Sequence, residues 1–386
     1  MTDVVIAGIG QTPVGEHWQL SLRSLGIQAM RLALEDSGGL RPGALFVGNM
    51  LAPSLSRQAH LGALLADFAS LGGIEAETVE ASGASGGSAL RQGYMAVASG
   101  LVDVALVVGV EKFTDVIGSE VESALASGGD SDWELVQGLT TTGQAALLTR
   151  RYFHEFKVPA DGLAGFALND HANGAGNPNA MYRKAITLET YRKGEVVSDP
   201  LNLFDVAPVT DGAAALVLTR PELLPKKFAH PLVRIAASAT ASDTLALHDR
   251  ADLLWFAAAQ LSVEQALKKA GLSHAQIDLF EYHDAFTIYA ALSLEAAGFA
   301  ARGAGWKLAQ DGAIGLKGTI PCGTLGGLKA RGNPGGATGV YQAVEAALQL
   351  QGRAGVNQLP DPKHALIQSL GGPASTAVTH ILERVE

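Results

Sequence analysis

Short apolar runs rich in β-branched residues alternate with helical patterns along most of this 386-residue chain. In the first part, candidate strands lie at residues 4–9, 44–49, 76–81 and 103–110, and candidate helices at 21–37, 57–68 and 85–99. This βαβαβαβ order is typical of a mostly parallel sheet with helices on its faces. The run DVALVVGV at 103–110 is apolar throughout, which predicts a strand buried on both faces.

The same order returns in the second half. Candidate strands lie at 232–239, 277–282, 364–370 and 375–382, and candidate helices at 251–270 and 335–350. Similar helix ends, ALEDSG at 33–38 and ALKKAG at 266–271, precede a strand in both halves. We therefore expect a duplicated α/β unit, with an N-terminal half at 1–230 and a C-terminal half at 231–386.

A stretch of different composition, at about 112–205, separates the two sets of strands. It is richer in Asn, Gly and polar residues, as in NDHANGAGNPNAMYRK at 169–184. The stretch is too long for a plain loop, so it predicts an inserted lid or subdomain. Insertions of this kind often supply ligand contacts.

Composition excludes several classes of protein. The chain has 28 basic and 38 acidic residues and a net charge of −10, with no basic block, so nucleic acid is not an expected partner. No apolar run reaches the length of about 18 residues that suggests a membrane span. The single Cys excludes an intrachain disulfide and a Cys-rich zinc site. The N-terminus lacks the basic start of a secretory signal, so we expect a cytoplasmic protein. We also expect no bound metal or cofactor.

Three Gly-rich turns follow candidate strands, namely SGASGGS at 82–88, CGTLGGLKARGNPGGATG at 322–339 and SLGGPAST at 369–376. In parallel sheets, ligands bind outside the carboxyl ends of the strands. A Gly-rich turn that opens a helix exposes backbone N–H groups, which can hold a phosphate or the oxyanion of a thioester. His283, in EYHDAF at 281–286, also follows a candidate strand, so we expect it at the same edge.

Five longer segments carry a family resemblance. They are VEASGASGGSALRQGYMAVASGLVDVALVVGVEK (79–112), NDHANGAGNPNA (169–180), DPLNLFDVAPVTDGAAALVL (199–218), EYHDAFT (281–287) and GGLKARGNPGGATG (326–339). Together they resemble the thiolase superfamily, close to archaeal-type acetyl-CoA acetyltransferases and sterol-carrier-protein-type thiolases, over nearly the whole chain. The resemblance implies the α/β thiolase fold: two duplicated βαβαβ halves in a five-layer α-β-α-β-α sandwich with an inserted loop domain.

The resemblance also implies a reaction, but this chain lacks the side chains that carry it out in the family. Thiolases join or split acyl-CoA thioesters with a Cys thiolate that takes the acyl group, a His that activates it and a second Cys that moves protons at the α-carbon. The nucleophile position falls on Gly83 and the His of the Gly-His-Pro loop on Asn333. The position of the second Cys falls on Ala285 or Ser369. Ordinary thiolysis or condensation through an acyl-enzyme is therefore not expected.

Other elements of the family site are retained. His283 stands at an oxyanion-hole position of the sterol-carrier-type subgroup, and the backbone at Gly83 and Gly372 keeps its N–H donors. Two side chains are candidate substitute nucleophiles. Cys322 is the only thiol, although a buried small side chain is the simpler interpretation, and Ser85 follows Gly83 but has the place of a helix cap.

Binding of coenzyme A as substrate or ligand requires cations for its phosphates. The candidates in and near the site are Arg183, Lys184, Lys329 and Arg331. The resemblance further implies a homodimer or tetramer, and a zinc-ribbon/OB-fold partner protein that presents CoA in some archaeal-type members.

Three functions remain open. In the first, the chain is an acyl-CoA-binding protein of the acetyl-CoA acetyltransferase family whose activity is altered or lost. A non-catalytic scaffold subunit of an acyl-CoA-processing complex is one form of this alternative. Alternatively it is a Cys-independent retro-aldolase acting on a β-hydroxyacyl-CoA, for which Tyr282 and Tyr341 lie near the site in sequence. The third is a conventional acetyltransferase, which the missing Cys disfavours.

Overall fold

The computed structural model describes residues 3–116, 118–226 and 228–385. In the first half, five strands form a sheet in the order β3-β2-β4-β7-β1. Their bounds are β1 (Val5–Gln11), β2 (Ala44–Gly48), β3 (Glu75–Val79), β4 (Val104–Glu111) and β7 (Gly212–Thr219). Strand β2 pairs in parallel with β3 and β4, whereas β7 runs antiparallel to β4 and β1. Every residue of β4 is buried, as its unbroken apolar run predicts.

The second half repeats this arrangement with β8 (Leu232–Ser242), β11 (Thr376–Val385), β10 (His364–Gly371) and β9 (Leu279–Glu281), in that spatial order. Strand β11 runs antiparallel to β8 and β10, and β10 is parallel to β9. A bridge from Phe280 to Cys322 continues the sheet beyond β9. The strand order continues from β1 to β8, where Val5 pairs with Arg234 and the Ile235 N–H donates to the Val4 carbonyl oxygen at 2.9 Å. The predicted duplication is therefore confirmed.

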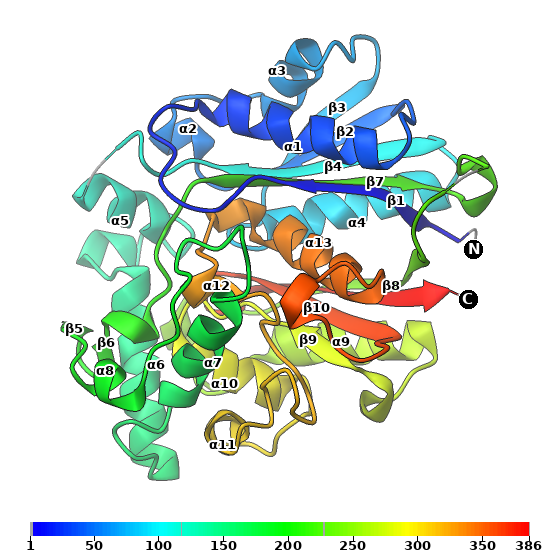
Figure 1. Ribbon diagram of the computed structural model, residues 1–386. Helices are drawn as coiled ribbons and strands as arrows, with labels where there is room; N and C mark the ends of the chain where they lie inside the picture. Colours follow the sequence, from blue (N-terminus) through cyan, green and yellow to red (C-terminus); the bar gives the residue numbers. More distant parts are fainter. Residues whose placement is uncertain (1–2, 117, 227, 386) are drawn as a thin grey trace.

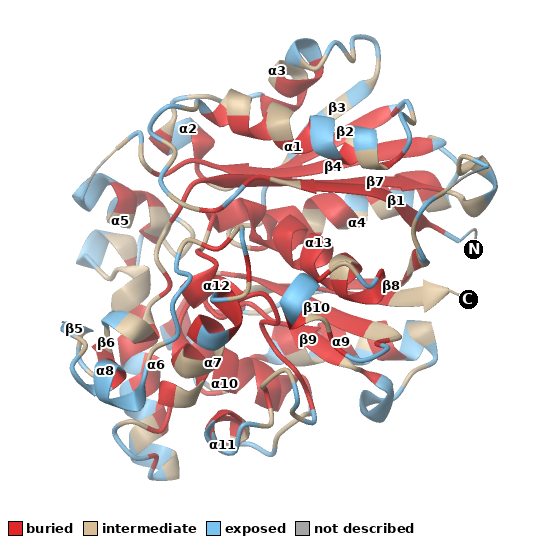
Figure 2. Cartoon of the chain, viewed as in Figure 1, coloured by how far each residue is buried: buried red, intermediate tan, exposed pale blue. Residues whose placement is uncertain are grey.

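Helices form three layers around the two sheets (Figure 1). Between the sheets lie α4 (Ser85–Ala98) and α13 (Thr338–Leu350), and nearly every residue of α13 is buried (Figure 2). The outer face of the first sheet carries α1 (Leu22–Asp36) and α3 (Leu61–Phe68). The outer face of the second sheet carries α9 (Ala257–Ala270) and α10 (Thr287–Ala296). This is the expected five-layer α-β-α-β-α sandwich.

Glycines allow the middle layer to pack closely. A Cβ atom at Gly86 of α4 would lie 2.8 Å from the carbonyl oxygen of Gly336, just ahead of α13. One at Gly87 would lie 2.9 Å from the Ser369 hydroxyl in β10. Because both contacts are too short for a side chain, the amino end of α4 can enter the middle of the molecule only with glycine there. The turn that carries Gly83 lies at this end.

The chain between β4 and β7 forms the insertion. Its elements are α5 (Ser119–Ala126), η1 (Leu135–Gln137), α6 (Thr141–Phe156), α7 (Ala164–Gly174), α8 (Leu188–Arg192), β5 (Val196–Ser198), β6 (Leu201–Asn202) and η2 (Leu203–Asp205). Helix α6 packs against α10, and α7 against α11 (Gly305–Gln310) and α12 (Gly327–Ala330). The insertion thus lies against the loops at one end of the second half (Figure 1).

Short elements complete the chain: α2 (Ala52–Leu55), η3 (Pro221–Leu223), η4 (Leu247–Asp249), η5 (His274–Gln276), η6 (Gly335–Ala337) and η7 (Gly355–Asn357). Two predicted helices begin later than expected. The helix predicted at 57–68 begins at Leu61, because Arg57 and His60 have positive φ angles of 50° and 59°. The helix predicted at 251–270 begins at Ala257, because the preceding residues form a turn in which Asp252 accepts from the Leu254 N–H. No helix within the described ranges is both long and apolar enough to cross a membrane.

Candidate active site

A cavity of about 190 Å³ lies where both halves meet the insertion. Its walls include Met50, Ser82 and Gly83 from the first half, Glu122, Leu125, Thr141 and Gln144 from the insertion, and His283, Phe286, Tyr289, Asn333, Leu370 and Gly372 from the second half. All four positions that the sequence assigned to one site, Gly83, His283, Asn333 and Gly372, line this cavity. The topology explains why. Gly83, His283 and Gly372 follow the carboxyl ends of β3, β9 and β10, and ligands of α/β sheets bind outside such ends.

The turn at Gly83 is held rigidly by its neighbours. Ser82 has a positive φ of 52°. The Ser85 hydroxyl donates to the Ser82 carbonyl oxygen at 2.6 Å and accepts from the Ala81 N–H at 2.9 Å. A Cβ atom at Gly83 would point at the His283 ring, 3.0 Å from Cε1 and 3.4 Å from Nε2. The position that the sequence assigned to the family nucleophile therefore faces a histidine but carries no side chain.

His283 is buried and neutral. Burial lowers its pKa to about 4, an effect that the nearby charges of Arg331 and Lys329 support and that of Asp284 opposes. A neutral imidazole carries one N–H donor and one acceptor nitrogen. Among the described residues, Nδ1 has no hydrogen-bond partner. His283 can therefore donate a hydrogen bond at the Gly83 side of the cavity without adding a positive charge to it.

A buried ion cluster holds the loop that carries His283. Lys329 Nζ lies 2.8 Å from Asp284 Oδ2, donates to the Asp284 carbonyl oxygen at 2.6 Å and lies 3.6 Å from Asp170 Oδ2. Burial alone would raise the pKa of Asp284, but Lys329 and its hydrogen bonds hold it at about 2. Burial and the Asp284 charge raise the pKa of Asp170 well above its usual value. Asp170 therefore keeps a proton, and Lys329 is balanced by Asp284.

The burial of these charges bears on the residues predicted to bind the phosphates of CoA. Lys329 and Arg331 are 2% and 1% exposed, and neither lines the cavity. Arg331 Nη1 lies 2.8 Å from Glu345 Oε2. Because both cations are buried and paired with carboxylates, the structure speaks against their predicted contact with CoA phosphates. Arg183 and Lys184 are exposed on the insertion, but they also lie outside the cavity wall.

The candidate substitute nucleophiles lie away from the cavity lining as well. Cys322 is fully buried, and its thiol donates to the Ile320 carbonyl oxygen at 3.2 Å. Burial raises the pKa of this thiol well above its usual value, with further contributions from nearby carboxylates, so it is not a reactive thiolate. Ser85 is buried and occupied by its two bonds within the Gly83 turn. Their surroundings support the structural interpretation of both side chains.

Asn333 presents an amide to the cavity. Its Oδ1 accepts from the Thr338 hydroxyl at 3.1 Å, and its backbone N–H donates to the Pro208 carbonyl oxygen at 2.9 Å. With Oδ1 engaged, the amide nitrogen can serve as a donor. Gly372, with a φ of 56°, borders the cavity in the turn between β10 and β11.

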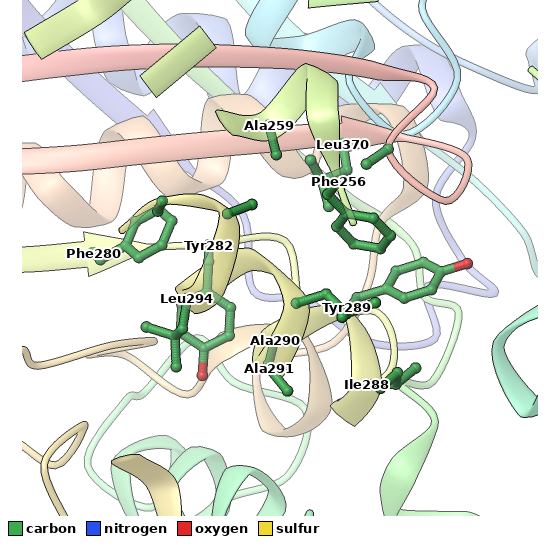
Figure 3. Close-up of a cluster of buried hydrophobic side chains, with 14 of the residues drawn as sticks. Phe256, Ala259, Phe280, Tyr282, Ile288, Tyr289, Ala290, Ala291, Leu294 and Leu370 are labelled. Atoms are coloured by element: carbon green, nitrogen blue, oxygen red, sulfur yellow. The ribbon is translucent and has the colours of Figure 1, made fainter. Parts of the chain in front are cut away.

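Two of the cavity-lining side chains that the sequence did not single out are Tyr289 and Glu122. Tyr289 lies one helical turn after Phe286, and their rings are in edge contact with centroids 5.0 Å apart. It points away from Tyr282 within the apolar cluster around α10 (Figure 3). Tyr282 and Tyr341, the two tyrosines singled out from the sequence, are fully buried and outside the lining. The second, Glu122 of α5, is the only carboxylate among the described residues that line the cavity, and nothing near it in the sequence signalled this place.

Comparisons with known proteins agree with the resemblance seen in the sequence. Residues 4–222 match the family described as "Thiolase, N-terminal domain", and residues 239–384 match "Thiolase C-terminal domain-like". An acetyl-CoA acetyltransferase of Methanothermobacter thermautotrophicus is 40% identical over 386 residues, covering 100% of both chains. A steroid side-chain-cleaving aldolase of Thermomonospora curvata is 29% identical over 388 residues, covering 96% of each. A solved structure described as "Ltp2-ChsH2(DUF35) aldolase" has a TM-score of 0.83 and 26% identity, covering 99% of this chain and 98% of that chain.

Proposed function

The chain belongs to the thiolase superfamily, and from this premise we propose that it binds an acyl-CoA thioester in the cavity and acts on it without forming an acyl-enzyme. The observation that carries the proposal is the environment of Gly83. A side chain there would meet His283, yet the position has none, and Cys322 lies outside the cavity lining. The groups that remain, His283, Asn333 and backbone N–H groups, stabilise a thioester oxygen rather than attack a carbonyl carbon.

We propose retro-aldol cleavage of a β-hydroxyacyl-CoA as the reaction. A base removes the proton of the β-hydroxyl group, the oxygen forms a carbonyl, and the Cα–Cβ bond breaks. The bonding electrons move into the thioester as an enolate, which is then protonated at Cα to give a shorter acyl-CoA. The step needs a base and donors for the enolate oxygen but no covalent intermediate. The aldolase names of one relative and of the structural neighbour support this choice over thiolysis.

The charge of the cavity bears on how CoA is held. Among its described lining residues there is no Lys or Arg, so the phosphates of CoA must find cations elsewhere. The solved neighbour is named as a complex with a DUF35 component. We propose that the exposed pair Arg183 and Lys184, or a second protein of that kind, supplies the cations for the CoA phosphates.

The test compares two substrates on the purified full chain. Acetoacetyl-CoA with free CoA reports thiolysis, and a panel of β-hydroxyacyl-CoA compounds, followed by mass spectrometry of the acyl-CoA products, reports retro-aldol cleavage. We expect cleavage of at least one β-hydroxyacyl-CoA, no thiolysis and no acyl adduct on the intact protein. Thiolysis, or an acyl group bound to the protein, would overturn the proposal. Saturable acyl-CoA binding without any cleavage would favour the non-catalytic subunit instead.

A further inference from the structure

The cavity wall contains one acidic side chain whose surroundings set it apart from the other carboxylates of the interior. Glu122 lies on α5, and Leu125, one turn later on the same helix face, also lines the cavity. The helix reaches the site at its carboxyl end, where a Cβ atom at Gly128 would lie 2.7 Å from the Ser82 hydroxyl oxygen. The carboxyl end of α5 therefore borders the Gly83 turn, and Glu122, in the first turn of the same helix, lines the same cavity.

Glu122 has no partner for its charge. No hydrogen bond or ion pair engages its carboxylate within residues 3–116, 118–226 and 228–385. By contrast, buried Glu111 accepts from the N–H groups of Met50 and Gly336, and buried Glu281 accepts from Thr324. Those carboxylates are structural acceptors, whereas Glu122 is half-buried and open to the cavity.

Its surroundings favour a proton acceptor. Its neighbours on α5, Val121 and Ala124, pack in an apolar cluster with Leu51 and Phe113. Burial raises the pKa of Glu122 above its usual value, and no opposing hydrogen bond is present to lower it. A carboxylate with a raised pKa is a stronger base and remains ionised enough to act near neutral pH.

The other polar groups that line the cavity are poor candidates for the same role. His283 is the donor beside Gly83, and Asn333 is a neutral amide. Burial raises the pKa of Tyr289, so its phenol stays protonated at neutral pH. Glu134, beyond Gly129, is occupied by the N–H groups of Asp130 and Leu247.

We propose that Glu122 is the general base of this site, a role that rests on the proposed retro-aldol function. Its carboxylate takes the proton of the β-hydroxyl group as the Cα–Cβ bond breaks, and the resulting carboxylic acid returns that proton to Cα of the enolate. One proton leaves oxygen and one reaches carbon, so no oxidant, reductant or further reactant is required. The acyl-CoA product leaves Glu122 ionised for the next turnover.

The return step gives a test that does not depend on the natural substrate. If Glu122 protonates the enolate, the reverse step removes an α-proton from bound acetyl-CoA, and in D₂O the native protein incorporates deuterium into that methyl group. We expect Glu122→Gln to lower the exchange rate by about 10²–10⁴-fold, the usual contribution of a general base. The rate in the native protein should rise with pH through the raised pKa of Glu122, and this limb should be absent from the variant. Glu120→Gln is the matched control, because Glu120 is exposed on the same helix and outside the cavity.

Acetyl-CoA binding, measured by calorimetry on all three proteins, separates the two proposals. Unchanged binding with lost exchange in Glu122→Gln alone supports the general base. Exchange that continues undiminished in Glu122→Gln, or cleavage of a β-hydroxyacyl-CoA at the native rate, overturns this role while the proposed function stands. A native protein that binds acetyl-CoA but does not exchange its α-protons also overturns the proton return. A native protein that binds no acyl-CoA refutes the proposed function itself.

Discussion

A methyl group added at Gly83 should destabilise the folded protein by about 2 kcal/mol, within the usual range of about 1–3 kcal/mol for overpacking a core. In Gly83→Ala the new Cβ atom would lie 2.7 Å from the Leu370 carbonyl oxygen and 3.0 Å from His283 Cε1. The carbonyl would have to retreat by about 0.7 Å to restore an ordinary contact of 3.4 Å. Leu370 is paired with Ala377 in the β10–β11 ladder, so this movement strains the sheet.

The assay is urea denaturation followed by intrinsic fluorescence, with Gly72→Ala as the control. Gly72 is exposed, and a Cβ atom there would meet nothing within 4 Å. We expect the midpoint of Gly83→Ala to fall and that of the control to stay within error of the native protein. Equal stability of Gly83→Ala and the native chain would refute the close packing around position 83. Gly83→Cys carries the same contact, so any thiolysis gained in a Gly83→Cys/Asn333→His variant should come with lower stability.

Three further predictions concern groups behind the cavity. The folded protein keeps a proton on Asp170 that the unfolded chain loses above pH 3.8, so this group should make stability fall as pH rises from about 4 towards its raised pKa, by up to about 1.4 kcal/mol per pH unit. Buried Glu111 and Glu345, whose pKa values burial raises to about 7 and about 8, add slopes of the same sign. Asp170→Asn should therefore reduce the slope in urea titrations without abolishing it, and an unchanged slope would contradict the prediction. Arg331→Met leaves Glu345 buried and unpaired, which should lower the free energy of unfolding by about 3–5 kcal/mol. Arg331→Met/Glu345→Leu should recover most of that loss. A double variant as unstable as the single one would argue against the pair. Cys322 should react with a thiol reagent only after denaturation, and rapid modification of the native protein would show that it is accessible.

The fold and the outline of the site could be predicted because both depend on patterns along the chain. Alternating strand and helix signals repeat between the halves, and the structure confirms this duplication. Gly83, His283 and Gly372 each follow a strand, and the topology alone brings strand ends together. Their chemical roles remain predictions, which the exchange and cleavage assays test.

The roles of the charged residues could not be predicted, because partners far apart in the chain decide them. Lys329 and Arg331 lie in a Gly-rich loop near the site and were expected to contact the phosphates of CoA. Their partners Asp284 and Glu345 are 45 and 14 residues away, and only the packed structure turns two apparent phosphate ligands into buried ion pairs. Glu122 presents the opposite case. Its sequence surroundings are those of an ordinary amphipathic helix, and its lack of a partner is a property of the residues that surround it in space.

The charge balance of the cavity follows from these two results. With Lys329 and Arg331 paired elsewhere and His283 neutral, Glu122 is the only charged side chain among the described residues of the wall. In the proposed reaction, the proton that passes from the β-hydroxyl group to Glu122 would neutralise this carboxylate as the enolate oxygen gains its negative charge. The charge thus moves across the cavity without changing in total, so neutral donors such as His283 and Asn333 are sufficient to stabilise it. A thiolate nucleophile at position 83 would instead have only the amino end of α4 to lower its pKa, since the described residues of the cavity wall include no Lys or Arg.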